Sequence, residues 1–391
     1  MMNYSWLCFF LLAVMALGGL VYQGLAIFCV WQFRQRKNTP AKTGLPPISL
    51  LKPLHGAEAG LDQYLANFFQ QDYPNYEILF AVRAATDPAV AIVHQLQKFF
   101  PQRRAQLLFT DEPPYANAKV YSMEKMAAAA SYDLLVITDS DTEVTPDYLK
   151  AVACAFADPQ VGALTHLYRG VARDEFWAKL EALGMSTEFM AGVIVAEKLE
   201  GMKFALGPSM AIRKQCLQDI GGFAAMRDYL ADDFVLGHWA DRAGWQVKLG
   251  SFIVNHHVST TGFTPTYQHR LRWNRSTRFS RPAGYFGQAF TYALSWSLLL
   301  FGFFPSNLTL AWLVLTLIVR LLLAMLLGRG VLKDAAVLPR LWFLPLQDIL
   351  SFASWCGGWM SREIIWRGER YRLLAQGKFA PVIAREATKP N

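Results

Sequence analysis

The chain has 391 residues, of which 53% are hydrophobic and only 17% are charged, and its formal net charge is +8. Soluble domains carry about 25% charged residues, so this composition excludes a disordered or collagen-like chain and argues against a purely cytosolic enzyme. The five cysteines are scattered without a Cys-x-x-Cys pair, which argues against a disulfide scaffold or a structural zinc site. In a membrane protein an excess of positive charge is first a topology signal, and no nucleic-acid partner is expected.

The first predicted element is an apolar helix near the N-terminus. Trp6–Trp31 is an almost unbroken apolar run, and about 20 such residues are enough to cross a bilayer as a helix. Three basic residues, Arg34, Arg36 and Lys37, follow it directly. Because basic flanks stay in the cytoplasm, residues 1–33 are predicted to be a membrane anchor whose N-terminus lies outside.

Residues 42–281 have the composition of a soluble domain, in which strand-like and helical segments alternate. Such alternation predicts βαβ units and a parallel sheet, and therefore an α/β domain, which the anchor would hold in the cytoplasm. The expected strands are Ile48–Pro53, Glu77–Val82, Gln106–Thr110 and Leu134–Thr138. The expected helices between them are Leu61–Gln71, Pro88–Phe100 and Ala118–Ala130.

Apolar runs return after this domain. Ala289–Phe304 and Leu308–Leu327, joined by the turn Pro305–Asn307, predict a membrane hairpin that crosses out and back. A third run, Leu341–Met360, contains Pro345 and a pair of adjacent glycines. We expect this run to be a broken, re-entrant or interfacial segment.

The membrane region at the C-terminal end is therefore placed at residues 285–360. Arg320 and Asp348 are the only charged residues within its apolar runs. Residues 361–391 follow as a tail with seven Lys and Arg against three Glu. This basic tail is predicted to lie in the cytoplasm.

Two carboxylates follow one of the expected strands. Asp139 and Asp141 come directly after Leu134–Thr138, and ligands of open α/β sheets bind at the carboxyl ends of strands. Alternate residues at such an end can reach one hard cation with oxygen ligands, leaving positions for diphosphate oxygens and water. The structural alternative is a capping turn before the helix that starts near Pro146.

A second acidic pair, Asp232 and Asp233, starts a helical stretch that runs to Ala243. Acidic residues in a first helical turn are favoured by the helix dipole without any function. The functional interpretation is that one of them removes a proton from an attacking hydroxyl group.

A basic stretch and two lesser signals complete the candidates. Arg272 beside Trp273 is a candidate for holding a leaving diphosphate, although a basic cluster before a membrane segment also suits anionic lipid. Gly207 and Ser209 precede a short expected strand, where small residues let a ligand approach the backbone. Asp87 follows the strand Glu77–Val82, either as a helix cap or as a site residue.

Taken in order, these motifs resemble the family-2 and family-21 types of GT-A glycosyltransferases, most closely the ceramide glucosyltransferase family. The segment Arg281–Tyr285 and the arginine-rich stretch before it look most like the bacterial glycosyltransferases associated with hopanoid biosynthesis. The resemblance covers about Pro47 to Trp273. It is carried by Lys52-Pro53-Leu54, Asp72–Glu77, Asp87-Pro88, Asp139-Ser140-Asp141, Asp232-Asp233 and Arg272-Trp273.

The resemblance implies a GT-A fold, a UDP-sugar donor and Mg²⁺ or Mn²⁺ at Asp139 and Asp141. It implies Asp233 as the catalytic base, with Asp232 in support, and a pocket for acceptor and sugar at Gly207, Ser209 and Trp273. In the family pattern (Gln or Arg)-x-x-Arg-Trp the first position is here His269, which departs from the family. The implied donor contacts are Lys52, Pro53, Asp87, Asp139, His269, Arg272 and Trp273.

Three functions are compatible with these signals. The first is an inverting transferase that moves one sugar, glucose or N-acetylglucosamine, from a UDP-sugar to the hydroxyl group of a ceramide-like or hopanoid lipid. The second is a processive polysaccharide synthase, which needs a polymer channel. The third is a membrane-anchored protein that binds a sugar or lipid without catalysis. A bacterial inner-membrane location with a cytoplasmic catalytic domain is expected, and the oligomeric state is left open.

Overall fold

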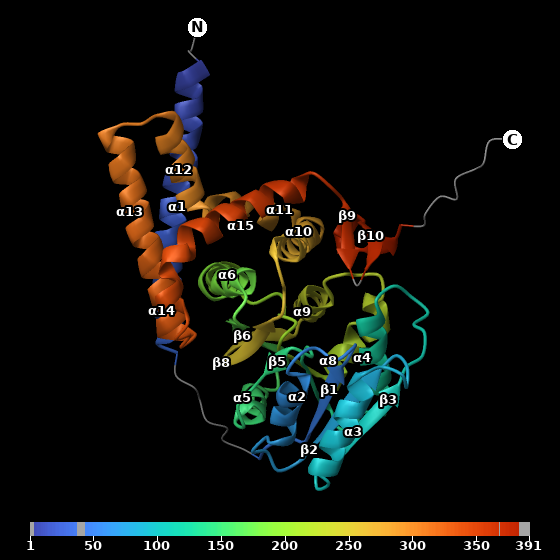
Figure 1. Ribbon diagram of the computed structural model, residues 1–391. Helices are drawn as coiled ribbons and strands as arrows, with labels where there is room; N and C mark the ends of the chain where they lie inside the picture. Colours follow the sequence, from blue (N-terminus) through green and yellow to red (C-terminus); the bar gives the residue numbers. More distant parts are fainter. Residues whose placement is uncertain (1–3, 37–43, 367, 383–391) are drawn as a thin grey trace, which may run out of the picture.

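The computed structural model describes residues 4–36, 44–366 and 368–382. Lys37, the predicted domain start at residue 42 and the tail residues 383–391 lie outside the described residues. The apolar helices Tyr4–Arg34, Ala293–Phe303 and Asn307–Ala324 stand side by side above a mixed α/β domain, and the first of them begins at the far end of this group (Figure 1).

The first half of the domain has the predicted order of strands and helices. Four parallel strands lie in the order β3-β2-β1-β4. Strands β2 and β4 are buried along their whole length, as expected for a sheet covered on both faces. The strands are β1 (Ile48–Pro53), β2 (Tyr76–Val82), β3 (Ala105–Phe109) and β4 (Leu134–Ile137). The helices are α2 (Leu61–Phe69), α3 (Ala89–Phe99) and α4 (Ala118–Ala129).

The second half makes the sheet mixed, which corrects the expectation of a parallel sheet. Strand β7 pairs antiparallel with β4 and with β6, and β5 pairs antiparallel with β8, giving eight strands in the order β3-β2-β1-β4-β7-β6-β8-β5. These strands pair with segments that are distant in the sequence. The local pattern of apolar residues therefore cannot show whether a pair is parallel or antiparallel. The added strands are β5 (Thr142–Glu143), β6 (Val161–Ala172), β7 (Met210–Arg213) and β8 (Gln246–Val258).

Helices of this half connect the sheet to the apolar helices. Helix α6 (Phe176–Gly184), a π-helical turn (Met185–Phe189) and α7 (Met190–Glu200) follow one another without a break. Helix α10 (Phe263–Ser280) leads into α11 (Pro282–Gly287). The other helices of this half are α5 (Tyr148–Ala155), α8 (Lys214–Asp219), α9 (Asp232–Arg242) and the 3-10 turns Phe223–Met226 and Gln288–Thr291.

Within the described part of the chain, two helices are long and apolar enough to cross a membrane. They are α1 (Tyr4–Arg34) and the helix Asn307–Val331, which comprises α13 (Asn307–Ala324) and a π-helical end (Met325–Val331). The apolar helix between them, α12 (Ala293–Phe303), has 11 residues. It rises only about 16 Å, roughly half a bilayer core, so the first arm of the predicted hairpin is shorter than expected.

The third apolar run forms one helix, α15 (Leu344–Trp359), after α14 (Val337–Arg340) and a 3-10 turn at Leu341–Phe343. The helix continues through its glycine pair without a break, and it runs across the group formed by α1, α12 and α13 (Figure 1). With 16 residues, α15 shows no break, and its re-entrant or interfacial placement stays a prediction.

The predicted tail contains folded structure. A three-stranded antiparallel sheet is formed by β9 (Glu363–Trp366), β10 (Glu369–Leu373) and β11 (Phe379–Pro381), with a 3-10 turn at Ala375–Gly377. In Figure 1 it lies at the end of α15, beside α10 and next to the α/β domain. We call β9–β11 the C-terminal sheet.

Candidate active site

The turn after β4 rests on a buried lysine. Lys52 in β1 has no exposed surface; its Nζ donates to the backbone carbonyl of Asp139 at 2.6 Å and lies 4.1 Å from the ring centre of Phe68. Burial lowers the pKa of Lys52 to about 7. The side chain thus supports the turn from beneath, which differs from the predicted direct donor contact.

A second lysine joins the two acidic motifs. Helix α4 starts after β3 and is capped by Asn117, whose side chain accepts from Val120 N at 3.2 Å. Lys119 in its first turn places Nζ 2.8 Å from Asp139 Oδ1 and 3.3 Å from Asp232 Oδ2. Although burial opposes it, these carboxylates raise the pKa of Lys119, so it is a cation. Sequence reasoning missed this residue; its position just after the carboxyl end of a strand was the available signal.

Gly207 lies between the carboxylates. Its N–H donates to Asp233 Oδ2 at 2.9 Å, and a Cβ at this position would come within 2.8 Å of Asp139 Oδ2 and 3.4 Å of Asp233 Oδ2. A side chain here would therefore push the acidic motifs apart. The structure thus brings together Asp139, Asp232, Asp233 and Gly207, four of the predicted site residues.

The two members of the second acidic pair have different surroundings. Asp232 is buried against Lys119, whereas Asp233 is half-buried and accepts from backbone N–H groups. Burial, followed by the charge of Asp232, raises the pKa of Asp233 to about 6. A base with this pKa is mostly ionised at neutral pH and can accept a proton, as general-base catalysis requires.

Asp141 faces a histidine. Its Oδ1 lies 3.3 Å from His256 Nδ1, and neither buried atom makes a hydrogen bond of good geometry. Burial would raise the pKa of Asp141, but His256 and Lys52 outweigh it and lower that pKa. Burial lowers the pKa of His256, but the negative charge of Asp141 outweighs burial and raises this pKa to about 9. Sequence reasoning also missed His256.

These residues can be tested as ligands for the divalent cation that the resemblance implies. Among the described residues no group of three or more His, Cys, Asp or Glu side chains could hold a metal alone. A buried carboxylate oxygen of Asp141, two residues beyond Asp139, has no hydrogen bond. This pair of carboxylates fits a hard cation that takes its remaining ligands from diphosphate and water.

Helix α10 presents the residues of the Arg-Trp motif. His269 Nδ1 lies 2.5 Å from Glu181 Oε1, and Thr260 Oγ1 donates to the other oxygen of Glu181 at 2.9 Å. The side chains of Arg272 and Trp273 are half-buried on the same helix. Glu181, which sequence reasoning missed, therefore fixes the ring of His269.

Aromatic rings continue from this helix to the acidic site. The ring centres of successive neighbours lie 4.7, 5.9, 6.0 and 5.3 Å apart. The row consists of His269, Trp273, Phe189, Tyr168 and His256. Since Phe189 is exposed and Tyr168 is buried, the row runs from the surface beside α10 to Asp141.

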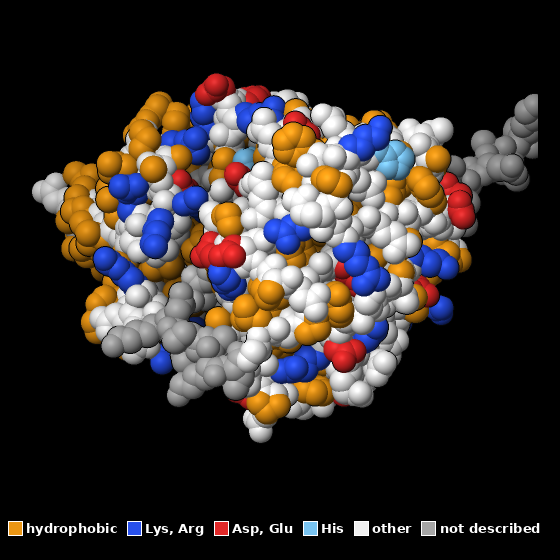
Figure 2. Space-filling view, turned by 90° about the horizontal axis from the view of Figure 1, so that it is seen from below, with side chains coloured by type: hydrophobic (Ala, Val, Ile, Leu, Met, Phe, Trp, Pro, Cys, Tyr) orange, Lys and Arg blue, Asp and Glu red, His pale blue; other side chains and the backbone are white. Residues whose placement is uncertain are grey.

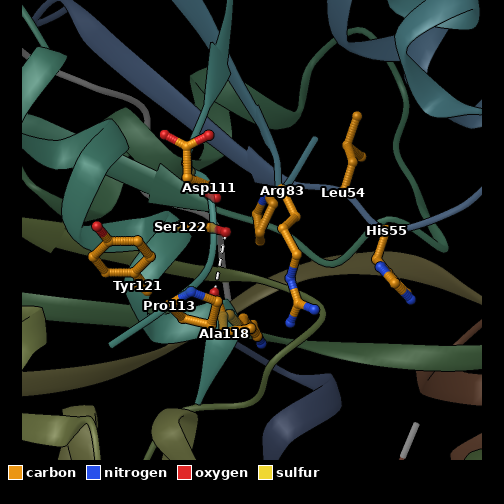
Figure 3. A pocket seen from close by; sticks show the side chains of 11 residues that line it. Leu54, His55, Arg83, Asp111, Pro113, Ala118, Tyr121 and Ser122 are labelled. Atoms are coloured by element: carbon orange, nitrogen blue, oxygen red, sulfur yellow. Dashed lines mark hydrogen bonds between the residues drawn. The ribbon is translucent and has the colours of Figure 1, made fainter. Parts of the chain in front are cut away.

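A pocket opens at the carboxyl ends of β1, β2 and β3 (Figure 3). His55 and Arg83 extend from the ends of β1 and β2 on one side, with Asp111, Ser122 and Tyr121 on the other. Pro53 and Lys119 also line it, which joins the pocket to the acidic site. Beside the pocket, Asp87 accepts from Gly56 N at 3.0 Å and from Ala89 N at 2.9 Å. Asp87 thus caps α3 and holds the loop after β1.

Ser209 occupies a structural position. It is buried, and its Oγ bonds to the hydroxyl of Tyr148 at 2.8 Å and to His166 Nδ1 at 2.9 Å. Both partners are buried, so the predicted role of Ser209 in the sugar pocket is not supported by its surroundings. Gly207, two residues earlier, is the member of this segment that faces the site.

Fold and site together define a GT-A glycosyltransferase. Residues 11–379 match the sequence model of glycosyl transferase family 21, and the chain belongs to this family. Ceramide glucosyltransferase 1 of Caenorhabditis elegans is 31% identical over 191 residues, which cover 49% of this chain and 41% of that protein. Beta-monoglucosyldiacylglycerol synthase of Synechocystis is 24% identical over 237 residues, covering 58% and 47%. The chain thus matches about half of the length of these relatives or less.

A solved structure shows the same fold. A mannosyltransferase from Pyrobaculum calidifontis, in complex with GDP-Man and Mn²⁺, superposes with a TM-score of 0.54 at 19% identity and covers 89% of this chain and 99% of that chain. The expected fold class is confirmed. The relatives named above do not show the resemblance to hopanoid-associated enzymes.

Proposed function

We propose that this protein transfers one sugar, glucose or N-acetylglucosamine, from a UDP-sugar to the hydroxyl group of a membrane lipid with inversion. The observation that carries the proposal is the convergence of Asp139, Asp232 and Asp233 on Lys119 and Gly207 in a GT-A domain joined to apolar helices. The names of the relatives, which describe ceramide and diacylglycerol glucosylation, support a lipid acceptor.

The donor would lie along the pocket of Figure 3, with its diphosphate toward Lys119 and the Asp139 turn. Asp139 and Asp141 would hold Mg²⁺ or Mn²⁺, which neutralises charge on the diphosphate when bound. The guanidinium of Arg272, on α10, is the further candidate for the leaving diphosphate.

Asp233 would remove the proton of the acceptor hydroxyl. The acceptor oxygen then forms a bond to the anomeric carbon, the bond from that carbon to the diphosphate oxygen breaks, and the electron pair leaves with UDP. Lys119 would stabilise the charge that develops on the departing diphosphate. Attack opposite the leaving group inverts the configuration at the anomeric carbon.

The acceptor would enter beside α10, where the aromatic row from Trp273 and Phe189 leads to Asp141. Apolar rings suit the body of a lipid and keep its hydroxyl at the acidic site. A ceramide-like lipid is the acceptor favoured by the relatives, and a hopanoid polyol is a further candidate. Attachment to a bacterial inner membrane with the catalytic domain in the cytoplasm belongs to the same proposal.

The alternative of a processive synthase is less well supported. Such a synthase needs a polar channel through its helices. Arg320 and Asp348 bind each other through two contacts of 2.9 Å and are buried, so they do not line a channel.

The test is sugar transfer by the purified full chain in lipid bilayers, with UDP-glucose or UDP-N-acetylglucosamine and ceramide or diacylglycerol as acceptor. We expect acceptor-dependent UDP release, one sugar per lipid by mass spectrometry, and loss of both with EDTA or with Asp141→Asn. Polymeric products would favour the synthase, and donor binding without UDP release would favour a binding protein.

A further inference from the structure

The C-terminal sheet packs on the segment that precedes the acidic pair. Its inner face is buried and forms an apolar cluster with Leu230, two residues before Asp232. The members contributed by the sheet are Ile364, Tyr371, Leu373 and Phe379. A sequence segment that looked like a charged tail is therefore in contact with the catalytic domain next to its acidic site.

Backbone bonds fix the same segment. Phe379 N donates to the carbonyl of Asp228 at 2.9 Å, and Leu230 N donates to the carbonyl of Gly377 at 3.3 Å. Tyr229 and Lys378 between them form an antiparallel bridge. Residues 228–230 thus extend the C-terminal sheet at its edge, and α9 with its acidic pair begins directly beyond them.

The held segment also reaches Lys119. The carbonyl of Tyr229 accepts from Asn117 Nδ2 at 2.8 Å, and Asn117 caps α4, which carries Lys119. One short segment therefore supports both the acidic pair and the lysine that bridges it to Asp139.

On its other side the sheet is bound to α10, the helix of the Arg-Trp motif. Arg275 Nη1 donates to the carbonyl of Glu363 at 2.6 Å. Gly377 has a φ of +81°, and a Cβ there would lie 2.3 Å from Ser280 Oγ. Only glycine allows both this conformation and this close approach, so residue 377 fixes how the turn sits between α10 and Leu230.

We propose that the C-terminal sheet is a positioning element of the active site: it holds residues 228–230 against α10, so that Asp233 and Lys119 keep their places relative to the residues on α10. The roles of those residues rest on the proposed function. The sheet itself touches no reacting atom, and its residues act only through Leu230, Tyr229 and α10.

The experiment compares single substitutions in the full chain in lipid bilayers. Leu230→Ala removes the apolar contact, Leu230→Met restores most of its volume, and Gly377→Ala displaces the turn. Ile365→Ala is the matched control, because this side chain of β9 is exposed on the outer face of the sheet. We measure kcat and the KM of the UDP-sugar, together with hydrogen exchange of residues 226–236.

Leu230→Ala and Gly377→Ala are expected to lower kcat by about 10–100-fold, since a misplacement near 1 Å has effects of this size. The KM of the donor should stay within about three-fold, exchange of residues 226–236 should rise, and Leu230→Met and Ile365→Ala should resemble the wild type. Unchanged kcat and exchange in both variants, or a lower yield of protein with wild-type constants, would overturn the proposal. Inactive wild-type protein would instead refute the proposed function, and hydrogen exchange would still decide the positioning role.

Discussion

At the residue scale, adjacent carboxylates of one motif have separate surroundings. Asp232 is paired with Lys119 at 3.3 Å, while Asp233 Oδ2 accepts from Gly207 N at 2.9 Å and remains half-buried. Burial raises the pKa of both carboxyl groups, but Asp232 is buried in its ion pair with Lys119, whereas Asp233 has an open side from which it can accept a proton. This difference favours Asp233 over Asp232 for the proton transfer.

Asp233→Asn is therefore expected to lower sugar transfer by about 10²–10⁴-fold, the usual effect of removing a general base. Binding of UDP should remain close to that of the wild type, because Lys119 and Asp139 are unchanged. Transfer rates and calorimetric UDP affinity of the two proteins provide the measurement. Near wild-type transfer, or a larger loss in Asp232→Asn, would contradict the assignment.

The pH dependence gives a second test of the same base. Burial and the charge of Asp232 raise the pKa of Asp233 to about 6, so its active, ionised form is lost as the pH falls through 6. We expect kcat between pH 5 and 8 to show an acid limb with a midpoint near 6. Asp232→Asn removes the neighbouring negative charge and should move that midpoint to lower pH in whatever activity remains. If the midpoint is the same in Asp232→Asn and in the wild type, the acid limb does not arise from the ionisation of Asp233.

The acidic motifs and Gly207 could be predicted from the sequence for different reasons. Asp139 and Asp141 follow a strand at the ligand-binding edge, whereas Asp232-Asp233 starts a helix and Gly207 precedes a strand. Whether Lys52 and Ser209 point toward the site or into the core could not be predicted. Strand β1 and its neighbours are buried on both faces, so the pattern of apolar residues does not show to which face a side chain points. Lys119 was missed for another reason. A single lysine in the first turn of a helix has no pattern of its own, and only the folded chain brings it to both acidic motifs.

At the element scale, local patterns located β1–β4 and α2–α4 within a few residues. The direction of β7 and the pairing of β6 with β8 depend on contacts between distant segments. The glycine pair of α15 was read as a break, yet it serves packing: a Cβ at Gly357 would lie 2.9 Å from Leu271, and one at Gly358 2.0 Å from the hydroxyl of Tyr285. Small residues let α10 and α11 approach this helix.

The same principle operates between α1 and α12. A Cβ at Gly19 would lie 2.5 Å from the Cα of Ala293, whereas one at Gly24, in the same helix, meets nothing within 4 Å. Gly19→Leu is expected to separate the two helices and to destabilise the protein by about 1–3 kcal/mol, as overpacking does. Gly24→Leu faces outward and should leave the thermal unfolding midpoint in detergent close to that of the wild type. Equal midpoints in both variants would show that α1 and α12 do not pack as described.

At the scale of the whole molecule, charge is distributed unevenly along the helix group. Helix α1 ends at the catalytic domain with Arg34, and Arg36, two residues further, binds Glu197 at 2.6 Å. Arg169 of β6 donates to the carbonyl of Lys333 at 2.9 Å, just beyond the end of the helix Asn307–Val331. Charged side chains of both signs spread over the face seen from below, with hydrophobic ones gathered at its left edge (Figure 2). The core of the domain extends to the apolar helices through Val30, Phe33 and Leu327, among others.

This arrangement predicts one orientation in the membrane, with the basic ends of the helices and the catalytic domain in the cytoplasm. Cys216 cannot report it, because its side chain is buried. We therefore expect Asn307→Cys, at the exposed first residue of α13, to react with an impermeant maleimide in intact cells. Lys98→Cys, exposed on α3, should react only in inverted membrane vesicles. The exposed Cys8 and Cys356 are replaced by serine in both proteins, and detergent-solubilised samples show full reactivity. Labelling of residue 98 in intact cells would reverse the orientation and separate the catalytic domain from a cytoplasmic supply of nucleotide sugar.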